Sequence, residues 1–167
     1  MRRRVELRAS FSVTATEIEA SAFAPFGDVV RALRTDGRTE WSGALKNTRA
    51  NARISLYTSA VRAVQLPVEL SVMERHPHSF QTFIPLDTSR YLICVAPNGA
   101  GDLPVLDSLR AFIVGAGTGI TYRANIWHHP MMALDRLAQF AVWMWRSGGD
   151  DDEEFVDLVP PARVQGP

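Results

Sequence analysis

The sequence predicts an all-β protein, and three observations lead to that prediction. Short apolar runs rich in β-branched and aromatic residues recur from residue 53 onward, with polar or glycine-rich turns between them. One run, residues 68–74, alternates apolar and polar side chains, which is the period of a half-buried strand. After residue 25 no long stretch shows the 3.6-residue period of an amphipathic helix. Many short strands of this kind are typical of a β-barrel or β-sandwich.

The N-terminal region carries the one helical signal. Within residues 10–23, Thr16 is placed to cap a helix, and Glu19 three residues later completes a capping-box pattern. Pro25, Phe26 and Gly27 then end the element. We therefore expect one short N-terminal helix, followed by a first strand at residues 28–30.

A polar segment and a series of strands follow. Residues 34–52 are rich in Arg, Thr, Gly and Asn, with Trp41 standing alone among them, and we expect a long loop or short hairpin there. Loops of this length in a compact domain are often functional. The apolar runs predict strands at residues 54–57, 68–74, 81–84, 91–95, 109–114 and 139–145. Turns are expected at residues 87–90, 98–102 and 115–119, and a solvated loop at residues 147–154.

Length and composition limit the classes of protein that fit. The 167 residues predict a single domain, and 46% hydrophobic residues are enough for a core without disulfides. The 18 basic and 18 acidic residues balance, so charge gives no reason to expect nucleic acid or a membrane as partner. No segment reaches the roughly 18 apolar residues of a membrane span. Cys94 is the lone cysteine, which indicates a reducing cytoplasm.

Two short clusters, residues 74–85 and 122–130, contain all four histidines. In an extended segment Glu74 and His76 point to one face and Arg75 to the other, because side chains repeat every two positions. His128 and His129 diverge for the same reason. We therefore predict that a barrel brings the two clusters together into one pocket, with an inward set formed by Glu74, His76, Gln81 and His128.

This inward set admits two kinds of chemistry. Neutral imidazoles and a carboxylate can bind a divalent metal ion with positions left open for a substrate. Without a metal, the same groups form a general acid–base set. The alternative is that they are buried, hydrogen-bonded residues of a barrel with no chemical role. For His78 and His129 we expect a structural or surface role.

The motifs themselves resemble a known family. They are Glu74-Arg75-His76-Pro77, Gln81-x-Phe83-Ile84-Pro85-Leu86, Leu109-Arg110-Ala111-Phe112 and Trp127-His128-His129-Pro130. In this order they resemble the ureidoglycolate lyase family of the cupin superfamily, over roughly residues 20–158. The resemblance implies a cupin-like double-stranded β-helix for the single domain 1–167, and a homodimer. Trp143 and Trp145 are candidates for the dimer interface.

The resemblance also implies an activity, the cleavage of (S)-ureidoglycolate to glyoxylate and urea, a late step of allantoin and purine breakdown. A base must take the hydroxyl proton of this carbinolamide while an acid protonates the leaving nitrogen. The candidate catalytic residues are His76 and His128 for proton transfer, and Glu74 to orient one imidazole. The candidate substrate-binding residues are Gln81 and Asn125 for the oxygens, and Arg110 or Arg123 for the carboxylate.

The cupin pattern further implies a possible metal site. Cupins place two ligands two residues apart, a third a few residues later and a last His on a far strand, which makes His76, Gln81 and His128 the candidate ligands here. Two departures from the family are Trp41-Ser42-Gly43 in the early loop and Phe80 before Gln81, and both can alter substrate specificity. The alternative functions are a metal-dependent cupin enzyme acting on another small carboxylate and a non-catalytic cupin binding module.

Overall fold

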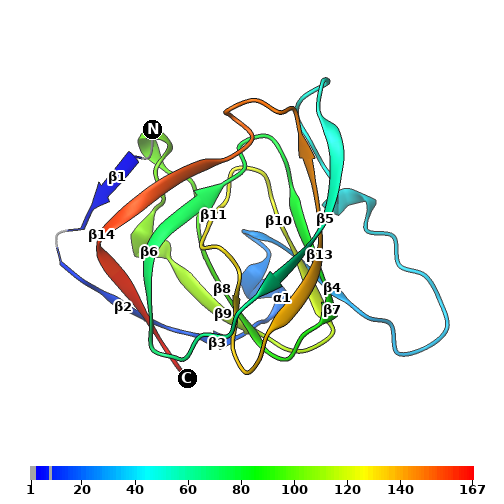
Figure 1. Cartoon of the computed structure of the whole chain (residues 1–167), viewed down its shortest axis with the longest axis horizontal. Coiled ribbons are helices and arrows are strands. Elements are labelled where there is room, and N and C mark those ends of the chain that lie inside the picture. Colours follow the sequence, from blue (N-terminus) through cyan, green and yellow to red (C-terminus); the bar gives the residue numbers. More distant parts are fainter. Residues whose placement is uncertain (1–2, 8) are drawn as a thin grey trace.

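Two β-sheets face each other in the computed structural model, which describes residues 3–7 and 9–167 (Figure 1). Within these residues the smaller sheet has five strands, in the order β4 (Gly27–Arg31), β10 (Thr118–Tyr122), β7 (Gln81–Asp87), β13 (Ala138–Arg146) and β5 (Arg53–Val61). The larger sheet, again among the described residues, has nine. Seven follow the order β1 (Arg3–Glu6), β14 (Glu154–Gln165), β6 (Val68–Arg75), β11 (Trp127–His128), β8 (Tyr91–Ala96), β9 (Arg110–Val114) and β3 (Thr16–Glu17). Beside them, β2 (Ser12–Thr14) pairs with β14, and β12 (Met132–Ala133) pairs with β8.

The eight central strands form one long antiparallel ribbon wound into a jelly roll. Along the chain they are β5 to β11 and then β13. The first pairs with the last (β5 with β13), the second with the seventh (β6 with β11), the third with the sixth (β7 with β10), and the fourth with the fifth (β8 with β9). Successive pairs lie alternately in the smaller and the larger sheet. This winding is the double-stranded β-helix of cupins, and the predicted all-β fold class is confirmed.

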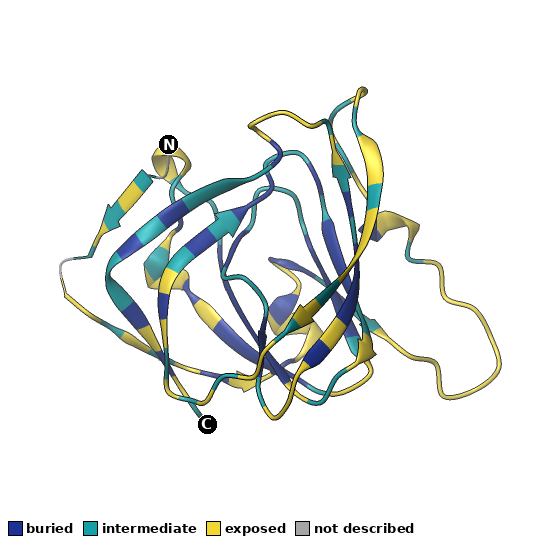
Figure 2. Ribbon diagram, in the orientation of Figure 1, coloured by how far each residue is buried: buried dark blue, intermediate teal, exposed yellow. Residues whose placement is uncertain are grey.

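Strand β8 shows how the sequence builds two hydrophobic cores. All six of its residues are buried, because successive side chains pack on opposite faces of the larger sheet. Tyr91, Ile93 and Val95 enter the inner core between the two sheets, whereas Leu92, Cys94 and Ala96 enter a second core on the other face. Figure 2 shows the buried residues concentrated along the strands that surround these cores.

The N-terminal segment links the two ends of the larger sheet. Strand β2 pairs with β14, and β3, which follows after the single residue Ala15, pairs with β9. The segment between β2 and β3 therefore covers one side of the second core, between β14 and β9. Ala15 is fully buried in this core.

The predicted capping box at Thr16 and Glu19 is wrong. The short helix α1 spans only Ala20–Phe23, and its N-cap Glu19 makes no side-chain capping hydrogen bond. Thr16 instead lies in β3, in register with Phe112 of β9. The sheet supplies hydrogen bonds to this backbone, and tertiary pairing outweighs a local helical preference. Phe23 is fully buried, with its ring edge-on to Phe112, which anchors the single helical turn.

The remaining expectations of structure are confirmed in their main features. The predicted strands correspond to β5 to β9 and β13. Residues 34–52 form a long loop, interrupted by a short 3-10 helix, Ser42–Ala44. Two further 3-10 helices, Ala100–Asp102 and Leu106–Ser108, lie between β8 and β9. Among the helices of the described residues, none has the length and apolar character needed to cross a membrane.

Candidate active site

The end of strand β6 directs consecutive side chains to opposite faces of the larger sheet. Glu74 lies in register with His128 of β11, and its Oε1 is 3.3 Å from the His128 Nε2. The ring centroids of His76 and His128 are 5.4 Å apart. Arg75 points to the second core, where its guanidinium lies 5.0 Å from the ring centre of Trp127. The structure thus brings Glu74, His76 and His128 together, and we call these three residues the triad.

Both imidazoles of the triad are held through Nδ1 by a backbone carbonyl. The His76 Nδ1 lies 3.0 Å from the Asp152 carbonyl oxygen, and the His128 Nδ1 lies 3.0 Å from that of Ile126. A carbonyl oxygen only accepts hydrogen bonds, so each Nδ1 carries a hydrogen. Each Nε2 therefore faces the triad. The buried His76 Nε2 has no hydrogen-bond partner in the described part of the chain, whereas the His128 Nε2 has the Glu74 carboxylate beside it.

Burial and mutual charge set the protonation of the triad. Desolvation lowers the pKa of His76 to about 4, with a further contribution from the neighbouring His128. Burial acts to raise the pKa of Glu74, but the hydrogen bond and charge of His128 outweigh it and lower that pKa below its usual value. At neutral pH the His76 side chain is therefore neutral and the Glu74 side chain is ionised.

Two further side chains line the pocket beside the triad. The Tyr122 ring stacks on the His128 ring, with centroids 4.2 Å apart and an interplanar angle of 18°. Gln81 of β7 lies in register with Tyr122 of β10. The Tyr122 hydroxyl and the Gln81 Oε1 are buried and, among the described residues, also lack a hydrogen-bond partner. Buried polar atoms are rarely left unpaired, so these two atoms and the His76 Nε2 together indicate a place for a ligand beside the triad.

An arginine that the sequence analysis did not select lies near this pocket. On β13, Met144 and Arg146 project to the same face because they are two residues apart. The Arg146 Nε is 3.4 Å from the Met144 Sδ, and the Gln81 Nε2 lies 3.9 Å from the same sulfur and 3.4 Å from the Tyr57 hydroxyl. The Arg146 charge acts to lower the pKa of both His76 and Tyr57, although desolvation dominates both pKa values. The even spacing along the predicted strand 139–145 was the signal that could have suggested Arg146.

The structure places both predicted carboxylate-binding arginines elsewhere. Arg110 is exposed and lines a separate surface hollow of about 210 Å³ together with Thr14 and Ala22. Arg123 donates to the Ala24 carbonyl, and its guanidinium lies 3.4 Å from Asp28. Both arginines therefore contact the N-terminal part of the chain rather than the triad.

Asn125 supports the pocket from outside rather than lining it. Its backbone N–H donates to the His76 carbonyl oxygen at 2.8 Å. Its side-chain oxygen accepts a hydrogen bond of 2.6 Å from Arg75, on the second-core side of the sheet. Asn125 has a positive φ of 70°, which asparagine tolerates better than most residues. Its contacts fit a role in holding the ends of the two clusters together.

The other two histidines lie outside the triad, His78 half exposed and His129 partly buried. The His78 side chain is 36% exposed, with its Nε2 3.3 Å from Asp151 and its Nδ1 3.1 Å from the Thr48 hydroxyl. The Nδ1 of His129 donates to the Pro130 carbonyl oxygen at 2.7 Å. Neither contact joins these imidazoles to the triad.

The triad fits a divalent metal ion. Glu74, His76 and His128 each offer one ligand atom, and these atoms lie within 4.8 Å of one another. Metal-binding histidines usually donate their other ring N–H to a carbonyl or carboxylate, as both imidazoles do here. Gln81, which the cupin pattern suggested as a ligand, lies on β7 of the smaller sheet, and its Oε1 has no hydrogen-bond partner among the described residues. Glu74 supplies the carboxylate of the cluster.

Of the two departures from the family pattern, Trp41 lies away from the pocket. It lines an apolar hollow of about 300 Å³ with Thr82, Ile84 and Trp143. Thr82 and Ile84 alternate with Gln81 along β7, so this hollow is on the outer face of the smaller sheet. Phe80 lies next to Gln81, and its backbone N–H donates to the Lys46 carbonyl oxygen of the long loop.

Comparison with known proteins gives a consistent result. Residues 10–164 match the family model described as ureidoglycolate lyase. A ureidoglycolate lyase of Pseudomonas fluorescens is 34% identical over 158 residues, covering 86% of this chain and 91% of the relative. One from Burkholderia cepacia is 41% identical over 134 residues, covering 72% of each chain. Among solved structures, a dTDP sugar isomerase from Desulfovibrio desulfuricans aligns over 77% of this chain and 78% of its own, with 13% identity and a TM-score of 0.47.

Proposed function

The chain belongs to the ureidoglycolate lyase family and is a lyase, and we propose that it cleaves (S)-ureidoglycolate to glyoxylate and urea in the pocket of the triad. The observation that carries this proposal is the pair of imidazoles of His76 and His128, whose ring centroids are 5.4 Å apart and which lie beside the single carboxylate of Glu74. Elimination of urea needs one group that accepts a proton and one that donates a proton, close to the same carbon atom.

The hydrogen bonds distinguish the two imidazoles in the metal-free form. The His76 Nδ1–H donates to Asp152, and the neutral ring keeps a lone pair on Nε2, which suits a base that removes the hydroxyl proton. The His128 Nδ1–H donates to Ile126, while its Nε2 faces the ionised Glu74 carboxylate. We assign the role of the acid to the His128–Glu74 pair, which passes the hydrogen between these two groups to the leaving nitrogen. The C–N bond then breaks as the carbonyl of glyoxylate forms.

The substrate carboxylate is assigned to Arg146. Its Nε lies 3.4 Å from the Met144 sulfur, the Gln81 Nε2 lies 3.9 Å from the same sulfur, and the Tyr57 hydroxyl lies beside Gln81. An arginine fork matches a carboxylate in a bidentate way. The Arg146 Nη2 lies 3.4 Å from Glu153 at the surface, and the side chain is 42% exposed, so a substrate carboxylate would compete with Glu153 for the guanidinium.

A divalent cation is the alternative way for the triad to support the same reaction. Bound to Glu74, His76 and His128, it would polarise a substrate oxygen and stabilise developing negative charge. The cluster of ligand atoms also supports a second candidate function, a metal-dependent cupin enzyme acting on another small carboxylate. Elemental analysis of the purified protein, with activity measured before and after chelation, distinguishes the metal-free form from the metal-dependent form.

The test of the proposed function is direct measurement of urea and glyoxylate release. We expect equal amounts of both products from (S)-ureidoglycolate, and a KM raised by at least tenfold in Arg146→Gln. Arg123→Gln is the matched control, because it removes a guanidinium whose contacts are with Ala24 and Asp28 rather than with the triad. Substrate binding without product release would instead support the non-catalytic binding module.

Three further expectations belong to this proposal, namely a place in allantoin and purine breakdown, a cytoplasmic location and a homodimer. The residues suggested for the dimer interface are partly covered, since the Trp145 indole donates to Leu45 and Trp143 adjoins Trp41. The exposed apolar side chains of edge strand β5 are better candidates, with Ile54 54% and Leu56 60% exposed. Sedimentation of the wild type and of Leu56→Glu tests this interface.

A further inference from the structure

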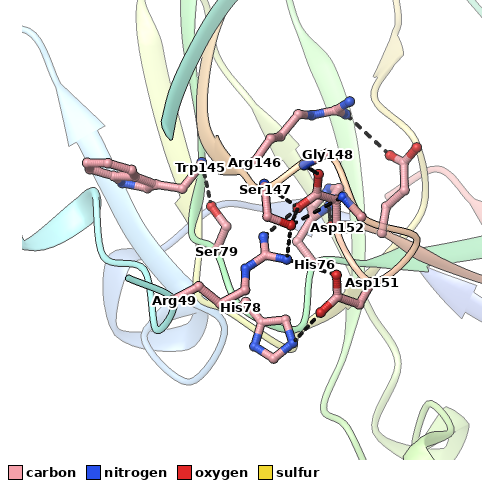
Figure 3. A network of polar contacts seen from close by, with 12 residues as sticks. Arg49, His76, His78, Ser79, Trp145, Arg146, Ser147, Gly148, Asp151 and Asp152 are labelled. Carbon is pink, nitrogen blue, oxygen red and sulfur yellow. Dashed lines mark hydrogen bonds and ion pairs between the residues drawn. The ribbon is translucent and has the colours of Figure 1, made fainter. Parts of the chain in front are cut away.

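The loop between β13 and β14 is built around one buried carboxylate, that of Asp152 (Figure 3). The Asp152 side chain is 8% exposed. It accepts hydrogen bonds of 2.8 Å from the backbone N–H groups of both Ser147 and Gly148, and it is paired with Arg49. Burial acts to raise the Asp152 pKa, but these hydrogen bonds outweigh it and lower that pKa to about 2. The carboxylate is therefore ionised at any pH at which the protein works.

The backbone of this loop adopts a shape that the carboxylate stabilises. Gly148 has a φ of +83°, a conformation that favours glycine, and its N–H is thereby turned toward Asp152. The Asp152 N–H donates to the Gly149 carbonyl oxygen at 3.1 Å, which closes the turn. The position of the Asp152 backbone thus depends on its own side chain.

Arg49 ties this loop to a distant part of the chain. It comes from the long loop of residues 34–52 and lies 103 positions before Asp152. Its side chain is only 12% exposed, and its Nη1 donates to the Ser147 hydroxyl at 2.9 Å and to Asp151 at 3.0 Å. Two loops that are remote in sequence are thereby joined next to the His76 ring.

The Asp152 carbonyl oxygen is the acceptor for the His76 Nδ1, at 3.0 Å. A neutral imidazole carries one hydrogen, and the partner of one ring nitrogen decides which nitrogen holds it. An acceptor at Nδ1 leaves the lone pair on Nε2, the atom that faces Glu74 and His128. Both forms of the proposed reaction need this lone pair, whether as a base or as a metal ligand.

We propose that Asp152 and Arg49 are positioning residues that hold His76 in the tautomer with its hydrogen on Nδ1. Asp152 acts through its backbone carbonyl, whose position its own carboxylate secures, and Arg49 acts by holding that carboxylate. The effect on turnover rests on the proposed function, whereas the tautomer of His76 can be measured without any substrate.

The test compares Asp152→Asn with the wild type in full-length protein. The amide keeps the size of the side chain but loses the charge, and its NH2 group replaces one of the two oxygens that each accept from a backbone N–H. We expect kcat to fall by about 10- to 100-fold, as for other residues that orient a catalytic or metal-binding histidine, with KM changed by less than about threefold. Long-range 1H–15N spectra of the four histidines should show His76 with hydrogen on Nδ1 in the wild type and a mixture of tautomers in Asp152→Asn.

Asp151→Asn is the matched control. It makes the same chemical change one residue away, at a side chain that is 55% exposed and contacts only Arg49 and His78 among the contacts described. We expect wild-type kcat and an unchanged His76 spectrum. Arg49→Gln is the second route to the same effect, with a smaller loss of kcat in the same direction, because the carboxylate keeps its two backbone donors.

The results separate the positioning role from a purely structural one. A lower melting temperature with wild-type kcat and an unchanged His76 tautomer in the folded variants would overturn the proposal. If Asp152→Asn does not fold, Arg49→Gln decides by the same two measurements. Absence of urea release by the wild type, together with the expected tautomer change in Asp152→Asn, would contradict the proposed function and leave the positioning of His76 supported.

Discussion

Two polar clusters lie on opposite faces of the same strand end, and they differ in how completely their hydrogen bonds are satisfied. On the second-core side, the Arg75 side chain is 4% exposed and donates to Asp102, Asn125 and Glu154. On the inner side, the His76 Nε2, the Gln81 Oε1 and the Tyr122 hydroxyl lack a hydrogen-bond partner among the described residues. Arg75 thus belongs to a network in which the hydrogen bonds are satisfied, whereas its neighbours Glu74 and His76 lie in a cluster in which some polar atoms have no partner.

The difference indicates which cluster stabilises the fold and which binds a ligand. A buried arginine must be paired, because desolvation of an unpaired charge is too costly. The contacts of Arg75 with Asp102, Asn125 and Glu154 meet that need. The imidazoles of the triad are held in place through Nδ1 and keep their other nitrogen available, which a purely structural histidine does not require. The following predictions test this contrast.

The largest effect is expected from the triad itself. His76→Ala and His128→Ala should each lower kcat for urea release by about 10²–10⁴-fold while the melting temperature changes little. The double variant should be hardly worse than the more damaged single variant, since groups that act as a unit are not additive. Steady-state kinetics and thermal unfolding on the same preparations measure both quantities. Loss of activity that only follows loss of folded protein would mean that the triad is structural.

The next effect is a dependence of stability on pH between about 6.5 and 4. The pKa of His76 is lowered to about 4 by burial, whereas the unfolded chain titrates near its ordinary value of 6.5. As pH falls through this window the unfolded state binds a proton that the folded state does not, so the free energy of unfolding decreases, by at most about 3 kcal/mol. His76→Ala should remove this part of the slope in denaturant titrations.

The Arg75 cluster should respond in a different pH range, which sharpens the contrast. Hydrogen bonding to Arg75 lowers the pKa of Asp102 below its ordinary value of 3.8. The stability from this contact is therefore complete above that value and is lost only as the pH falls below it. Burial also lowers the pKa of His129, which contributes to the same pH range. A loss of stability between pH 6.5 and 4 that was as large in His76→Ala as in the wild type would contradict this assignment of the two windows.

Removal of Arg75 should destabilise the protein without a direct effect on chemistry. Arg75→Met leaves the Asn125 side-chain oxygen without its donor, and an unsatisfied buried group costs about 1–3 kcal/mol. Glu154 keeps Arg3 as a partner and Asp102 keeps Asn98, so these two carboxylates are not left unpaired. Denaturant unfolding measures the loss. A kcat reduced as strongly as in the triad variants would show that the two faces are functionally coupled.

The smallest effects are expected at the two peripheral histidines. His78→Ala removes surface contacts with Thr48 and Asp151, and His129→Ala removes one contact with a carbonyl. Each should change kcat by less than about threefold, and surface substitutions of this kind usually change stability by less than about 0.5 kcal/mol. A loss of kcat comparable to that of His76→Ala in either variant would show that the reaction uses an imidazole outside the triad.

Local patterns in the sequence determined the strands and which side chains share a face. A strand repeats every two residues, so the opposite directions of Glu74 and Arg75 follow from the sequence once the strand is recognised. The paired apolar faces of residues 91–95 follow in the same way. The two histidine clusters identified the pocket because imidazoles close to an acidic residue are rare by chance in so few positions.

Only the tertiary structure decided which distant residues support these groups. Arg49 and Asp152 meet across two loops, and Arg146 rather than Arg110 or Arg123 adjoins the pocket. No local sequence pattern identifies the ion-pair partner of an arginine, because its long flexible side chain can pair with any carboxylate that the fold places nearby. Which carboxylate lies near each arginine depends on the register between strands that are far apart in the chain.

The two ends of the chain show the same limit. Thr16 and Glu19 carry a local helix signal, yet β3 forms because β9 offers an edge with which to pair. The sequence analysis placed no element after residue 154, where Pro160 and Pro161 argue against a strand. Strand β14 nevertheless runs from Glu154 to Gln165, with both prolines inside the register shift between Asp157 and Ala162. Local preference determines the secondary structure of a segment when no other backbone is available to pair with it. At both ends of the chain a strand of the larger sheet is available, and pairing with it outweighs the local preference.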